Sequence, residues 1–118
     1  MKFALLHLDQ AVELLLKERV RMFGQSIYKP GGKETISIWA AHEALAKLNC
    51  KIPEKADLEL LHEERNSIQH KYANPSPEDA EFHFEKALTF ILRFSKDELK
   101  VNVRDFVPSS FIDEVLPP

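Results

Sequence analysis

Residues 57–72, DLELLHEERNSIQHKY, form the stretch that decides the fold. Apolar side chains recur in it at intervals of three and four residues, the spacing of one buried helical stripe, at Leu58, Leu61, Ile68 and Tyr72. Arg65 occupies the middle of that stripe. A guanidinium stays charged at any ordinary pH, so a packed arginine costs on the order of several kcal/mol unless it meets an anion, a carbonyl or water. The stretch therefore predicts a helix whose inner face carries an arginine that needs a partner.

Two further helices precede this one. The first is expected over residues 3–23, where apolar residues outnumber what one stripe requires, so we expect it to pack on two neighbours. The second is expected over residues 35–49, with Thr35 or Ser37 as its N-cap. Asp57 is the expected cap of the helix that carries Arg65.

The fourth helix has the clearest start in the sequence. Ser76 is placed to cap it, Pro77 suits its first position, and acidic residues follow in the first turn. Residues 1–99 thus predict an all-α domain, an up-and-down bundle of four helices joined by short links. Residues 100–118 contain too many apolar side chains for a disordered tail. We expect this C-terminal extension to pack on the bundle or on a partner, with one helical turn near residues 110–115.

A narrow polar strip follows the first helix at steps of four residues: Asp9, Glu13, Lys17 and Arg21. One interpretation is a solvated face with favourable ion pairs between successive turns. The other is that Glu13, flanked by leucines, reaches Arg65 and orients it, since an arginine on an apolar stripe needs some partner.

The composition is that of one intracellular domain. The chain has 118 residues and a net charge of −3, with no apolar run long enough for a membrane helix. Because no basic field covers the whole chain, RNA binding requires a local basic cleft. The single cysteine, Cys50, excludes an internal disulfide and fits the cytoplasm. The histidines are scattered and HExxH is absent, so we expect neither a metal site nor a cofactor.

The segment 65–70, RNSIQH, resembles the signature of the HEPN family (higher eukaryote and prokaryote nucleotide-binding), an arginine followed after four to six residues by a histidine. The family often has a polar residue directly after the arginine, as Asn66 is here. The opening LDQAVELLLKE, the proline-containing link before residue 57 and the segment PSPEDAEFHFEKALTFILRF also resemble HEPN proteins. The likeness covers most of residues 1–99.

This resemblance implies a HEPN-type bundle that forms a homodimer with a composite site between the protomers. It also implies a metal-independent RNA endonuclease that leaves a cyclic phosphate and a 5′-hydroxyl, with a role in defence or as a toxin. Arg65, Asn66 and His70 are then the catalytic residues. Lys71 and Lys17 are weaker candidates for holding neighbouring phosphates of the RNA substrate.

The chemistry of these side chains agrees with that activity. Cleaving RNA without a metal requires a proton acceptor for the 2′-hydroxyl, a stabiliser of charge on the phosphorane and a proton donor for the leaving oxygen. An imidazole such as that of His70 acts as acid or base near neutral pH. Arg65 supplies a planar donor pair for phosphate oxygens, and Asn66 positions a phosphate oxygen or the imidazole.

A second interpretation leaves the chain without activity. Arg65 then pairs with a carboxylate of the first helix, and His70 lies at a helix C-terminus, where a cation is favoured. The protein is in that case a HEPN-like dimerisation module or a nucleotide- or RNA-binding module. The acidic net charge favours this alternative, whereas the complete motif favours the nuclease.

Tyr72 also has two interpretations. Its place on the stripe with Leu58 and Ile68 favours a core or interface aromatic. The continuation His70-Lys71-Tyr72 resembles the Arg-x4-His-x-Tyr form of toxins paired with a nucleotidyltransferase antitoxin. That likeness implies that an antitoxin partner modifies Tyr72 and so blocks the site.

Overall fold

The computed structural model describes residues 2–71 and 74–116. Its elements in that part are the helices α1 (Lys2–Met22), α2 (Ile38–Lys47), α3 (Lys55–Lys71), α4 (Pro77–Asp97) and α5 (Ser109–Val115), and the short 3-10 helix η1 (Val103–Asp105). An isolated β-bridge joins Tyr28 and Thr35 in the loop before α2. The prediction of an all-α fold is confirmed. No helix in the described ranges is long and apolar enough to cross a membrane.

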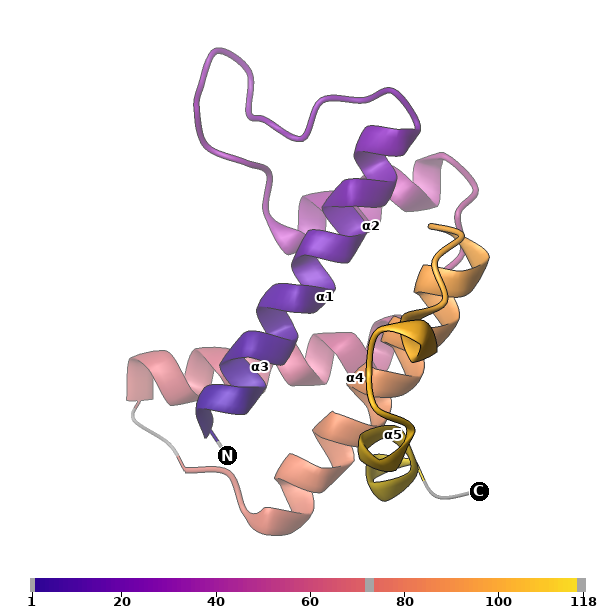
Figure 1. Cartoon of the computed structure of the whole chain (residues 1–118). Coiled ribbons are helices and arrows are strands. Elements are labelled where there is room, and N and C mark those ends of the chain that lie inside the picture. The colour runs from indigo at the N-terminus through magenta and orange to yellow at the C-terminus, as the bar shows by residue number, and fades with distance from the viewer. Residues whose placement is uncertain (1, 72–73, 117–118) are drawn as a thin grey trace.

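Helix α1 lies at the centre of the fold and packs against α2, α3 and α4 (Figure 1). We expected α1 to pack against two neighbouring helices, and the structure shows three. Helices α3 and α4 also contact each other, while η1 and α5 pack on α4. All four long helices contribute to one core, which includes Leu5, Val12, Leu16, Ile38, Leu45, Leu58, Leu61, Ile68, Phe90 and Phe94.

Helix α2 is shorter than expected because its first predicted turn makes contacts outside the helix. Ser37 is the N-cap, and its hydroxyl accepts a hydrogen bond from the Ala40 amide at 3.1 Å. Thr35 instead lies in the β-bridge with Tyr28. Asn49 has a left-handed φ of 61° directly after the C-cap, which ends the helix.

The starts of the next two helices differ in how well they were predicted. Helix α3 begins at Lys55, so Asp57 lies in its first turn and the prediction that Asp57 caps it was wrong. Helix α4 begins as predicted, with Ser76 as N-cap and Pro77 at the first position. The Ser76 hydroxyl accepts from the Asp79 amide at 3.1 Å. In the C-terminal segment, the expected helical turn is α5, and Ile112 within it is completely buried.

Replacing Ser76 with alanine should lower the free energy of unfolding by about 1 kcal/mol, because the Asp79 amide loses its acceptor at the exposed start of α4. Urea unfolding followed by circular dichroism measures the difference. Ser110→Ala in α5 is the matched control, since Pro108 rather than a serine stands at the N-cap of that helix. Equal losses in the two variants would contradict the capping role.

Candidate functional site

The polar strip of α1 is turned inward over most of its length. Asp9 is 2 % exposed and Lys17 is 5 % exposed, whereas Arg21 at the end of the strip is exposed and pairs with Glu18. The interpretation of this strip as a solvated face is wrong for Asp9 and Lys17, but the side chain of Glu13 is 33 % exposed and forms with Lys17 an ion pair between successive turns, as that interpretation predicts. The reason for the burial of Asp9 and Lys17 is the central position of α1, which has α2, α3 and α4 packed around it.

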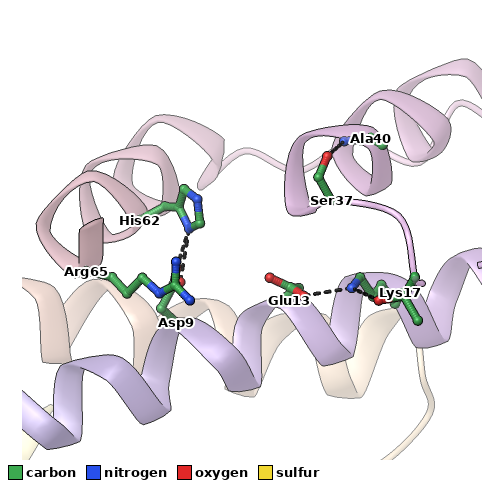
Figure 2. Close-up of polar contacts among 8 residues, drawn as sticks. Asp9, Glu13, Lys17, Ser37, Ala40, His62 and Arg65 are labelled. Atoms are coloured by element: carbon green, nitrogen blue, oxygen red, sulfur yellow. Dashed lines mark hydrogen bonds and ion pairs between the residues drawn. The ribbon is translucent and has the colours of Figure 1, made fainter. Parts of the chain in front are cut away.

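Asp9 forms the anchor of the site. Its carboxylate lies 3.0 and 3.3 Å from Nδ1 of His62, and Oδ2 lies 3.8 Å from Nε of Arg65. Figure 2 shows both α3 side chains reaching toward Asp9 on α1. Burial raises the pKa of the Asp9 carboxyl, while the hydrogen bond and charge of His62 and the charge of Arg65 act in the opposite direction. A nearly buried acid thus ties the two helices together at this point.

Asp9, rather than Glu13, is the ion-pair partner of Arg65. Glu13 instead accepts a hydrogen bond from Nζ of Lys17 at 2.7 Å, one turn along the same helix. The expectation that Glu13 orients Arg65 is corrected accordingly, because Lys17 already occupies its carboxylate. The packed guanidinium does have a carboxylate partner, as expected, but this partner is Asp9, one turn before Glu13.

The environment of Lys17 differs from that of a side chain free to bind phosphate. Its ammonium group donates to Glu13 and to the Thr35 hydroxyl, both at 2.7 Å, and the side chain is buried. Figure 2 shows this group next to the start of α2. Lys17 therefore ties α1 to the loop before α2. The side chain of Lys71 and the whole of Tyr72 lie outside the described residues.

The three residues of the motif lie on two neighbouring pockets. The first, which we call the Arg65 pocket, has a volume of about 290 Å³ and is lined by Leu6, His7, Asp9, Gln10, Glu13, Arg65 and Gln69. The second, the His70 pocket, has a volume of about 520 Å³ and is lined by Glu63, Asn66, Ser67 and His70. Within one chain, Arg65 and His70 therefore line different pockets. Asn66 links them, since its Oδ1 accepts from Nη1 of Arg65 at 3.1 Å.

No family model, curated protein or solved structure matches this chain. The chemistry of the pockets is therefore the basis for a function. Among residues 2–71 and 74–116, no three His, Cys, Asp or Glu side chains are grouped so that they could hold a metal ion.

His62 is one of the site residues that sequence reasoning missed. Besides its bond to Asp9, its ring meets that of Trp39 edge-on, with the centroids 5.3 Å apart. The signal for it was present, because His62 precedes Arg65 by three residues and so shares its side of the helix. Trp39 is 41 % exposed, so it packs on His62 at the surface and does not belong to the core.

Proposed function

We propose that the protein is a metal-independent RNA endonuclease of HEPN type, built on an up-and-down helical bundle. The observation that carries this proposal is the setting of Arg65. Its Nε faces the buried Asp9, its Nη1 donates to Asn66, and 34 % of the side chain remains exposed at the Arg65 pocket. A guanidinium held through Nε and Nη1, with about one third of the side chain still exposed, is preorganised to bind a phosphate oxygen.

The remaining chemistry follows from the neighbouring pocket. His70 is exposed and can exchange a proton with a bound substrate. Asn66 lies between His70 and Arg65, and its amide nitrogen can donate to a phosphate oxygen while Oδ1 accepts from Arg65. Because the two pockets are separate in one chain, we propose that a homodimer brings His70 of one subunit to the RNA bound at Arg65 of the other.

A silent binding or dimerisation module is the second candidate. It is favoured by the ion pair between Arg65 and Asp9, which gives the arginine a structural task without any substrate. The net charge of −3 favours it as well, because most nucleic-acid-binding surfaces are basic.

The deciding experiment incubates the purified protein with a mixed pool of single-stranded RNA in excess EDTA. Alongside it are run an Arg65→Ala/His70→Ala double variant and an Arg104→Ala control at an exposed arginine of η1. We expect cyclic-phosphate ends with the wild type and the control, and their loss in the double variant. Background cleavage by all three proteins, each folded, would refute the nuclease and leave the binding module.

A further inference from the structure

The five histidines of the chain lie in different surroundings, and these decide which of them can reach a substrate. His42 and His83 are buried, with 4 % and 7 % of their surface exposed. His62 is held by Asp9, and its side chain is 13 % exposed. His7 and His70 are exposed on α1 and α3. Of these two, His7 is the one that lines the Arg65 pocket.

The Arg65 pocket offers His7 an environment suited to a phosphodiester. Its two acidic side chains are each engaged, Asp9 with Arg65 and His62, and Glu13 with the ammonium of Lys17. The amides of Gln10 and Gln69 line the same space, one from each helix. The pocket therefore combines a positioned cation, neutral hydrogen-bonding groups and an accessible imidazole between α1 and α3.

We propose that His7 is the catalytic base that acts with Arg65 in this pocket, a role that rests on the proposed ribonuclease function. His7 accepts the proton of the ribose 2′-hydroxyl as the 2′-oxygen forms its bond to phosphorus. The bond from phosphorus to the 5′-oxygen then breaks, and His70 of the partner subunit gives that oxygen a proton. The products are a 2′,3′-cyclic phosphate and a 5′-hydroxyl, and proton exchange with water restores both imidazoles.

The first test compares initial rates of RNA cleavage by the wild type, His7→Gln and a Glu81→Gln control at an exposed position of α4. His7→Gln is expected to lower kcat about 100-fold with little change in KM, as is typical for loss of a general base. The fall in rate toward acid pH, where a histidine base becomes protonated, should also disappear in this variant. Glu81→Gln should keep the wild-type rate and pH profile.

The second test mixes Arg65→Ala chains with His7→Gln chains. Arg65 and His7 line one pocket of one chain, so neither kind of chain carries an intact pair and mixing should restore no activity. Recovery of activity on mixing would show that the two residues act from different chains and would overturn the assignment. A His7→Gln rate within three-fold of an active wild type would overturn it as well and leave the nuclease proposal standing. An inactive wild type would refute both proposals.

Discussion

Replacing Asp9 with alanine is expected to lower the free energy of unfolding by about 3 kcal/mol. The substitution removes the carboxylate that accepts a hydrogen bond from His62 and pairs with Arg65. Both side chains then lose their acidic partner at the contact between α1 and α3. Breaking a buried pair on one side costs about 3–5 kcal/mol. The value belongs at the lower end of that range because Arg65 is about one third exposed and water can solvate its guanidinium.

The same substitution should reduce RNA cleavage about 100-fold if the proposed function holds, because the guanidinium loses the group that fixes its position. Urea unfolding at pH 7 gives the stability, and cleavage is measured well below the unfolding transition. Asp113→Ala, at an exposed acid of α5, is the control and should change neither quantity. A change in stability below 0.5 kcal/mol for Asp9→Ala, on the scale of an ordinary surface substitution, would contradict the anchoring role.

The second large effect is an acid-induced loss of stability caused by His42. Burial lowers the pKa of His42 from 6.5 to about 4, and the nearby charge of Lys55 adds to this effect. Between these two values the unfolded chain binds a proton that the folded chain does not, so stability rises with pH across this range. The stability that folding gains from keeping His42 neutral is fully present above pH 6.5 and is lost as the pH falls to about 4. It amounts to about 3 kcal/mol, at 1.36 kcal/mol for each unit of pKa shift.

His42→Phe keeps an aromatic ring in this position and removes the titrating group. We expect the wild type to lose about 3 kcal/mol more than this variant between pH 7 and pH 4. The fluorescence of Trp39, whose ring stacks on His42 with the centroids 6.0 Å apart, follows unfolding in both proteins. His70→Gln, at an exposed histidine, should keep the acid loss of the wild type. Parallel stability curves for the wild type and His42→Phe would show that another group causes the acid sensitivity.

The features that could be predicted from the sequence are those encoded by local spacing. The start of α4 follows from Ser76 and Pro77, whose capping geometry involves only the next few residues. The buried stripe of α3 follows in the same way from Leu58, Leu61 and Ile68, all of which are buried. In each case the signal and the structure that it specifies lie within a few turns of the chain.

The features that could not be predicted depend on contacts between distant segments. A row of two acidic residues followed by two basic residues, at four-residue steps, has the same sequence pattern on a solvated face as on a packed one. Only the position of α1 among three helices shows that Asp9 and Lys17 are buried. Likewise, the choice of Asp9 over Glu13 and the separate pockets of Arg65 and His70 depend on how α3 is rotated against α1.

The buried charges of Asp9 and Lys17 also bear on how uniquely the chain folds. Helix α1 carries leucines on several sides, so its hydrophobicity alone would permit more than one rotation about the helix axis. In the observed rotation, Asp9 meets His62 and Lys17 meets Thr35. A rotation that kept the Asp9 carboxylate buried but moved it away from His62 and Arg65 would cost several kcal/mol, on the order of the usual penalty, whereas the pair of Glu13 and Lys17 lies within α1 and would rotate with it. We therefore expect the contact of Asp9 with α3 to favour the observed rotation of α1 over other rotations of similar hydrophobicity.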